Sequence, residues 1–242
     1  MRAEVFGWQH WVYLAITIGL TVAGLICAKK FAKTEKSQNI ILKCMAAFLL
    51  VWILANRLSQ VFRYEEHRWD KLIPDSFCGM SSLVLSLSVL IGKKDNCVYH
   101  FVWLIALVGG VITIAYPTFI GQDISFFYLP TISGLLHHSA SIALVIALLL
   151  FKQIHITYKK WYCMVFGFCG YFTVGAFLMT VFGYTEAFHM VEPLLYNTPL
   201  TAWFVAPIYV GCYALLLLII ELVRKHKLKK NQNKLEETKT DR

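Results

Sequence analysis

Seven long apolar runs alternate with short polar connections along the 242-residue chain. A transmembrane helix needs about 20 mainly apolar residues to cross a hydrocarbon layer of about 30 Å, and each run meets this requirement. Backbone polar groups in lipid need partners within the protein, and the runs lack the alternation of barrel strands, so they are predicted to be helices. The predicted spans are residues 11–28, 40–58, 76–92, 97–115, 132–151, 161–183 and 202–222.

The composition excludes a water-soluble domain. Hydrophobic residues make up 58% of the chain and charged residues 15%, whereas typical soluble domains have about 45–50% and about 25%. A protein of this size with so little charge could not cover its surface in water. The predicted fold class is therefore an all-α polytopic membrane protein, a bundle of seven transmembrane helices.

Lysine and arginine are divided unevenly between the two sides of the predicted bundle. Of the 23 Lys and Arg residues, 17 fall in the first, third and fifth connections and after the last span, and four fall on the other side. Because cytoplasmic loops carry an excess of these residues, the N-terminus is predicted to lie outside and the C-terminus in the cytoplasm. The chain then divides into a seven-helix domain, residues 1–223, and a basic cytoplasmic tail, residues 224–242, without an apolar period beyond its first turn.

The positive charge does not indicate a nucleic-acid partner. The net charge of +9 is confined to short segments between apolar runs, and basic segments beside a span are attracted to anionic lipid headgroups. The predicted partners are therefore membrane lipids, and the sequence predicts no nucleic acid, metal ion or other cofactor. The short, loop-poor chain favours a bacterial plasma membrane and leaves the oligomeric state open.

One cysteine stands at the predicted start of the third span. Pro74 and Asp75 precede it, and both residue types are common where a helix begins. Cys78 therefore falls in the first turn, where the helix dipole favours the nucleophilic thiolate, although Asp75 and desolvation oppose this effect. Ser81 and Ser82 follow on the same helix. A cysteine in a span most often acts as a small apolar residue, and this interpretation is given to the other six: Cys27, Cys44, Cys97, Cys163, Cys169 and Cys212.

Two adjacent histidines, His137 and His138, are the sixth and seventh residues of the fifth span, about 9–10 Å below its outer end at 1.5 Å per residue. Neighbours on a helix point about 100° apart, so at least one of them faces the bundle. A titratable residue in a span is a functional candidate because its burial in lipid is costly. A core histidine hydrogen-bonded to another helix is the alternative, and both interpretations stay open. His100 and His155 are predicted to be ordinary interfacial residues.

Polar residues in the outer connections complete the candidate set. They include Asp75, His189 and Asp123, which is the only acid of the aromatic fourth connection, residues 116–131. That connection is too aromatic for a free loop and too polar for a span, so it is predicted to lie in the membrane interface. An interfacial aromatic belt without a functional role is the alternative for each outer loop.

These features together resemble the YwaF-like integral membrane proteins, a family that includes the animal transmembrane protein 164. The pattern comprises seven spans, with Pro74 and Cys78 four residues apart at the start of the third. It continues with a loop that holds Pro117, Gly121 and Asp123, and with aromatic residues ahead of a histidine in the fifth span. An aromatic, proline-bearing sixth loop completes it. The resemblance covers most of the chain and implies the same seven-helix fold.

The chain departs from the family pattern in having two adjacent histidines, and Ser139 after His138 favours His138 as the family position. It also has Phe77 before Cys78, where the family often has leucine. The animal member looks like a phospholipid acyltransferase that uses a cysteine and a histidine. The resemblance therefore implies Cys78 as the nucleophile and His138 or His137 as its base.

The leading functional hypothesis is a phospholipid acyltransferase or transacylase with its site at the outer side of the bundle. The Cys78 thiolate would attack a lipid ester, His137 or His138 would carry the proton, and the first turn of the third span would stabilise the oxyanion. The residues predicted to bind substrate are Ser81, Ser82, Asp123, Asp75 and His189.

Two alternatives come from other classes of protein. Histidines and aspartates on one side are also typical of seven-span zinc hydrolases, but adjacent histidines are poorly spaced to share one ion. A small-molecule transporter or sensor with an outward-facing polar cavity is the non-enzymatic alternative. The absence of an inverted repeat and of a charged pair in mid-membrane argues against a carrier.

Overall fold

The computed structural model describes residues 5–63, 66–117, 128–195 and 197–240, and these residues form helices and loops without a strand. The described helices are α1 (Trp8–Phe31), α2 (Glu35–Val61), η1 (Trp69–Leu72), α3 (Phe77–Ile91), α4 (Cys97–Ala115), α5 (Leu129–Leu150), η3 (Tyr158–Lys160), α6 (Tyr162–Val181) and α7 (Ala202–Thr240). Here η1 and η3 are short 3₁₀ helices. The all-helical prediction is confirmed, and each predicted span falls on an α-helix of its own.

Six of the α-helices in the described residues are long and apolar enough to cross a membrane. The exception is α3, whose 15 residues extend about 22 Å at 1.5 Å per residue. Ser76 caps the start of α3 by accepting a hydrogen bond from the N–H of Gly79, and Gly92 ends the helix before Lys93. The chain is an integral membrane protein.

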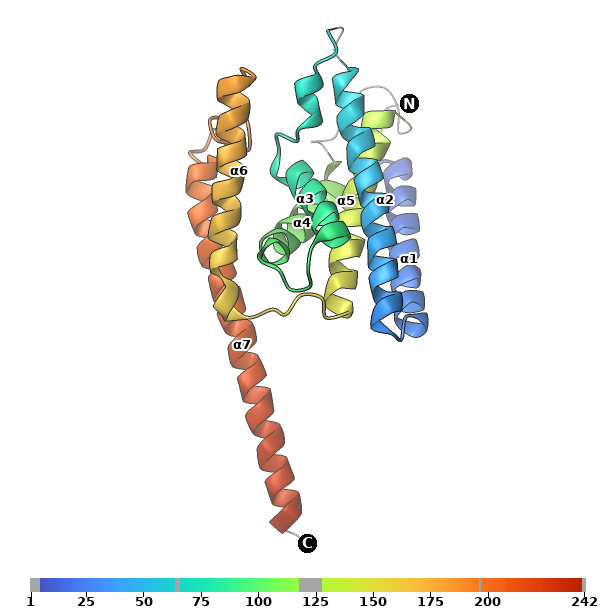
Figure 1. Cartoon of the computed structure of the whole chain (residues 1–242), viewed down its shortest axis with the longest axis vertical. Coiled ribbons are helices and arrows are strands. Elements are labelled where there is room, and N and C mark those ends of the chain that lie inside the picture. The colour runs from blue at the N-terminus through green and yellow to red at the C-terminus, as the bar shows by residue number, and fades with distance from the viewer. Residues whose placement is uncertain (1–4, 64–65, 118–127, 196, 241–242) are drawn as a thin grey trace.

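The last helix continues well beyond the predicted seventh span. The predicted tail, residues 224–242, has no apolar stripe, but α7 runs on through it to Thr240. Lysine, arginine, leucine and glutamate recur in this segment, and all have high intrinsic helix propensity. Figure 1 shows this part of α7 projecting away from the bundle. Residues 224–232 are all exposed, so this described part of the tail extends the last helix without a buried face to support it.

The central helices α3 and α4 lie between two groups of longer helices (Figure 1). On one flank α1, α2 and α5 run side by side, and on the other flank α6 runs beside α7. The three lysine-bearing connections α1–α2, α3–α4 and α5–α6 lie at the same end as the projecting part of α7. We call this the basic end, and we call the opposite end, which carries η1, the η1 end.

Small residues allow α5 to pack closely against its neighbours. Lipid tails are as apolar as leucine, so helices in a membrane associate through close packing and hydrogen bonds, and small residues let their backbones approach. On α4, Gly110 has the same role, because a Cβ atom added there would lie 2.8 Å from Ile142 of α5. The small residues buried on α5 are Ser133, Gly134, Ser139, Ala140, Ser141 and Ala147.

Candidate functional site

Cys78 lies in the first turn of α3, as the sequence predicts. Ser76 has an extended backbone before the helix, and its hydroxyl accepts a hydrogen bond of 3.3 Å from the N–H of Gly79. The Cys78 side chain is half-buried. The helix therefore begins at the η1 end with a cysteine in its first turn.

The thiol of Cys78 lies against α4. A Cβ atom on Gly109 would stand 2.7 Å from Sγ of Cys78, so α4 can approach the sulfur this closely only because residue 109 is glycine. One turn further along α4, Thr113 is a hydrogen-bond partner of the thiol, and its hydroxyl donates to the Gly109 carbonyl at 2.8 Å. Neither residue was predictable from the sequence, because glycine and threonine are common in apolar spans.

Replacing Gly109 with alanine is expected to destabilise the protein by about 1–3 kcal/mol, the usual cost of overpacking a tight contact. The matched control is Gly24→Ala in α1, where an added Cβ atom has nothing within 4 Å, so a gain of helix propensity of up to about 1 kcal/mol is expected instead. Thermal unfolding in detergent measures both effects. Equal stability of the two variants would contradict the close approach of α4 to the thiol.

Both histidines of α5 are buried, with 4% of His137 and 6% of His138 exposed. Nδ1 of His137 is 3.2 Å from the hydroxyl oxygen of Ser82, and that oxygen is 2.9 Å from the hydroxyl of Ser141. Ser82 is one helical turn beyond Cys78 on α3. The hydrogen bonds therefore attach His137 to the helix that carries the thiol.

The rings of His138 and His137 lie side by side, with their centroids 4.1 Å apart. Among the residues that the structure describes, the His138 ring has no hydrogen-bond partner, and neither histidine is hydrogen-bonded to Cys78. A Cβ atom added to Gly110 would lie 3.3 Å from the backbone carbonyl oxygen of His138. Gly110 directly follows Gly109, the residue that contacts the thiol. The thiol therefore lies against Gly109, and the backbone of His138 lies against the next residue of α4, Gly110.

Ser81 connects the cluster to α6. Its hydroxyl oxygen is 2.9 Å from the hydroxyl oxygen of Tyr171. The ring centroid of Tyr171 lies 4.7 Å from that of Phe101 on α4 and 5.9 Å from that of Phe77 on α3. Both serines predicted to bind substrate thus have a hydrogen-bond partner on another helix. The partner of Ser82 is on α5, and the partner of Ser81 is on α6.

Two further predicted residues, Asp75 and His189, have other surroundings. The Asp75 carboxylate accepts hydrogen bonds from Arg57 at 3.3 Å and Lys71 at 3.1 Å. Nδ1 of His189 is buried and has no partner within the described residues. No group of three His, Cys, Asp or Glu side chains that could hold a metal ion occurs in the described ranges. Asp123 lies outside the described residues.

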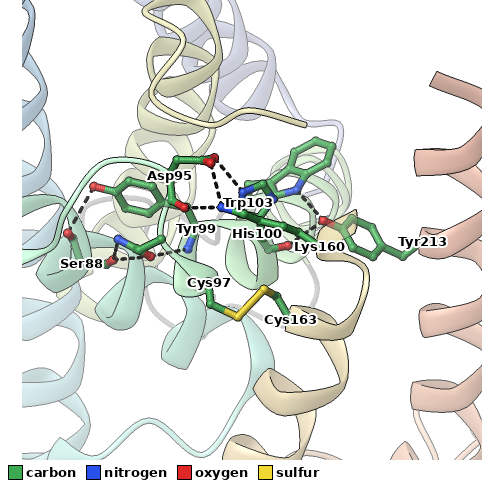
Figure 2. Close-up of a disulfide and its surroundings, with 10 residues drawn as sticks. Ser88, Asp95, Cys97, Tyr99, His100, Trp103, Lys160, Cys163 and Tyr213 are labelled. Atoms are coloured by element: carbon green, nitrogen blue, oxygen red, sulfur yellow. Dashed lines mark hydrogen bonds and ion pairs between the residues drawn. A yellow bond between two sulfur atoms is a disulfide. The ribbon is translucent and has the colours of Figure 1, made fainter. Parts of the chain in front are cut away.

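A second polar cluster, which the sequence analysis missed, lies at the basic end around Asp95 (Figure 2). Nε2 of His100 and the N–H of His155 donate to Oδ1 of Asp95 at 2.8 and 2.7 Å. Nζ of Lys160 donates to Oδ2 at 2.7 Å. The prediction that His100 is an ordinary interfacial residue is wrong, because its side chain is fully buried. We call these four residues the Asp95 cluster.

The Asp95 cluster makes stability depend on pH. Burial acts to raise the pKa of Asp95, but hydrogen bonds from Lys160, His155 and His100 outweigh it, so the pKa lies below its ordinary value. The ionised carboxylate therefore stabilises the fold above the ordinary pKa of about 3.9. This stabilisation is lost as the pH falls through the lower folded-state pKa.

Replacing Asp95 with asparagine is expected to lower the unfolding temperature at neutral pH. The difference from the unaltered protein is expected to shrink as the pH falls below about 4 and to vanish below the lower folded-state pKa, where the native carboxylate becomes protonated. Thermal unfolding in detergent over a pH series measures the difference. A difference that stays constant down to acid pH would contradict a stabilising role of the ionised side chain.

A disulfide joins Cys97, the first residue of α4, to Cys163 in the first turn of α6 (Figure 2). Their Cα atoms are 5.3 Å apart, although 66 residues separate them in sequence. The prediction that both are unpaired small apolar residues is wrong, because packing of α4 against α6 decides the pairing and the spacing along the chain does not. The other five cysteines, all in described segments, are free: Cys27, Cys44, Cys78, Cys169 and Cys212.

The sequence pattern of the TMEM164 family matches residues 5–223. No curated protein and no solved structure matches the chain. The matched range includes α1 to α6 and the first part of α7, so it contains Cys78, both histidines of α5 and the Asp95 cluster. The resemblance to the family of transmembrane protein 164 is confirmed, and the chain belongs to the TMEM164 family.

Proposed function

We propose that this member of the TMEM164 family is a membrane enzyme that transfers the acyl chain of a phospholipid through a thioester on Cys78. One observation carries the proposal: Cys78 contacts Gly109 of α4, and Ser82, one turn away, hydrogen-bonds to His137 of α5. Ser82, one turn from Cys78 on α3, thus connects the helix of the thiol with the helix of the two imidazoles. The resemblance to an animal phospholipid acyltransferase that uses a cysteine and a histidine supports the same chemistry.

His138 is the proposed general base. Ser82 already engages Nδ1 of His137, whereas no hydrogen bond within the described part of the chain occupies the His138 ring. Catalytic hydrogen bonds are often long or poorly aligned without substrate and tighten in the complex. The proposal therefore requires that the thiol of Cys78 and the His138 ring meet when the lipid ester is bound.

The reaction proceeds in two halves. His138 takes the proton of Cys78, and the thiolate attacks the carbonyl carbon of a phospholipid ester. The ester carbon–oxygen bond then breaks, the imidazolium gives its proton to the departing lysophospholipid oxygen, and the acyl group stays on sulfur as a thioester. In the second half, His138 takes a proton from an acceptor hydroxyl, whose oxygen attacks the thioester, and the proton returns to the released sulfur.

The start of α3 supplies donors for the oxyanion of each tetrahedral intermediate. The N–H groups of a first helical turn have no acceptor within the helix. The Ser76 hydroxyl accepts a hydrogen bond from the N–H of Gly79. The N–H of Cys78 is proposed to stabilise the negative charge. Ser81 and Ser82 are proposed to contact the ester, and His189, with its unpartnered Nδ1 in the described segments, to contact the headgroup.

All seven α-helices are proposed to cross the membrane, with the N-terminus outside and the basic end in the cytoplasm. The division of 17 Lys and Arg residues against four supports this orientation. The short helix α3 lies in the middle of the molecule (Figure 1), where its length need not match the lipid thickness. Cys78 then belongs to the outer half of a plasma membrane, and membrane lipids are both substrate and surroundings.

Purified protein in phospholipid vesicles tests the proposal. The vesicles contain a phospholipid with a labelled acyl chain and an unlabelled lysophospholipid as acceptor. We expect labelled diacyl product and, when the acceptor is left out, a label on the protein that hydroxylamine removes, as it does from thioesters. A folded protein that yields neither product nor protein-bound label would contradict acyl transfer.

A further inference from the structure

The disulfide between Cys97 and Cys163 has no part in the proposed acyl transfer. Cys97 is exposed at the start of α4, whereas Cys163 on α6 has 1% of its surface exposed. A thiol from outside the protein can therefore reach one sulfur, while the other is protected. Disulfide exchange depends on access to the attacked sulfur, and here only Cys97 offers that access.

The disulfide lies at the basic end, because Cys97 directly follows the α3–α4 connection, which holds Lys93 and Lys94. In the proposed orientation this end faces the cytoplasm, where small thiols keep cysteines reduced and the disulfides that occur are usually transient. We propose that Cys97 and Cys163 form a reversible thiol pair that is oxidised and reduced by the cytoplasmic glutathione-type thiol pool. This proposal rests on the proposed orientation of the chain, but not on the chemistry of Cys78.

The surroundings of Cys97 favour the thiolate that exchange requires. Asn96 caps α4 by accepting a hydrogen bond of 2.9 Å from the N–H of Tyr99, so Cys97 stands at the positive end of the helix. The N-terminus of a helix stabilises a thiolate.

Reduction takes two exchange steps. A glutathione thiolate attacks Cys97 Sγ, the protein disulfide bond breaks, and Cys163 leaves as a thiolate that takes up a proton. A second glutathione thiolate attacks the glutathione sulfur of the mixed disulfide, which yields glutathione disulfide and the Cys97 thiol. Oxidation by glutathione disulfide is the reverse, with Cys163 as the resolving thiolate.

Other contacts hold the two helix starts together when the disulfide is open. The N–H of Asp95 donates to the Gln153 carbonyl at 3.0 Å, and Nζ of Lys160 donates to the Asp95 carbonyl at 2.5 Å. One turn along, the Phe101 ring of α4 lies so close to Gly167 of α6 that an added Cβ atom would be 2.0 Å from it. The two thiols therefore stay within reach of each other.

The test measures the oxidation state of each cysteine in the full chain. Inside-out membrane vesicles are equilibrated with mixtures of glutathione and glutathione disulfide, and free and disulfide-bound thiols are then alkylated with two isotopically distinct maleimides. We expect Cys97 and Cys163 to change together, with the ratio of oxidised to reduced pair rising about tenfold for each tenfold rise in glutathione disulfide at a constant concentration of reduced glutathione. Cys163→Ser is expected to trap glutathione on Cys97, and Cys169→Ser, a free exposed cysteine of the same helix, is the matched control.

Three results would overturn the proposal. The pair could stay oxidised in excess reduced glutathione after the membrane is made permeable, which identifies a structural disulfide. It could stay reduced in excess glutathione disulfide. It could also react in right-side-out vesicles and not in inside-out vesicles, which would place the pair outside the cell. Acyl transfer by Cys78 is assayed separately, and its outcome does not depend on the behaviour of the Cys97–Cys163 pair.

Discussion

Replacement of Cys78 by alanine is expected to lower acyl transfer about a thousandfold or more, because removal of a covalent nucleophile removes the reaction path itself. The thiol is half-buried between α3 and α4, and its neighbours Gly109 and Thr113 accommodate a smaller side chain. The variant should therefore fold, and thermal unfolding checks this. Transfer of a labelled acyl chain to lysophospholipid in vesicles measures the loss.

The control for Cys78→Ala is Cys169→Ala, since Cys169 is free, exposed and on a different helix. It should keep full activity and should still carry the hydroxylamine-sensitive label. The Cys78→Ser variant separates nucleophilicity from shape, because it keeps the size but replaces the thiol with a weaker nucleophile. Normal transfer by a folded Cys78→Ala protein would eliminate the thioester mechanism.

Replacement of His138 by glutamine is expected to lower the rate of acyl transfer about 10²- to 10⁴-fold, the usual contribution of a general acid–base residue. Glutamine keeps a polar side chain of similar reach but cannot carry the proton between Cys78 and the lipid oxygen. Both half-reactions depend on that proton, so formation of the thioester and its transfer to the acceptor should both slow. Single-turnover labelling of the protein measures the first of these steps.

The matched control is His137→Gln. Its side-chain amide can form a hydrogen bond with the Ser82 hydroxyl in place of the one between that hydroxyl and Nδ1, whose atoms are 3.2 Å apart in the native protein. Weakening one hydrogen bond of this kind is expected to lower the rate of acyl transfer about tenfold at most. If His137→Gln instead shows the larger loss and His138→Gln the smaller one, then His137 is the base and the assignment made above is wrong.

The helices were predictable because the membrane imposes their length and apolar character. The predicted fourth span, residues 97–115, has the bounds of α4, and the start of α3 follows from Pro74 and Ser76. Helix continuation after residue 223 was missed, because the absence of an apolar period does not end a helix made of strong helix formers. The period of apolar residues along the chain indicates which face of a helix is buried. It gives no information on where a helix ends when that end is exposed.

The candidate site was only partly predictable. Cys78 and the histidine pair carry chemical signals of their own, namely a thiol at a helix start and two imidazoles in an apolar span. Gly109 and Thr113 carry none, and their role comes from the side of α4 that meets α3. Asp95 did have a signal, since it is the single acid that follows two lysines in its loop, but no spacing rule connects it with His100 or with Lys160.

The sequence by itself determined the helices and the membrane environment and supplied the candidate site residues, because hydrophobicity and helix capping act over a few neighbouring positions. The tertiary structure decided which of those residues meet. Ser82 is hydrogen-bonded to His137, 55 positions away in the sequence, and Cys97 forms a disulfide with Cys163, 66 positions away. Such pairs depend on the directions and rotations of the packed helices. Small residues at close contacts determine this packing, but small residues occur in any apolar span, so the sequence does not identify the ones that form contacts.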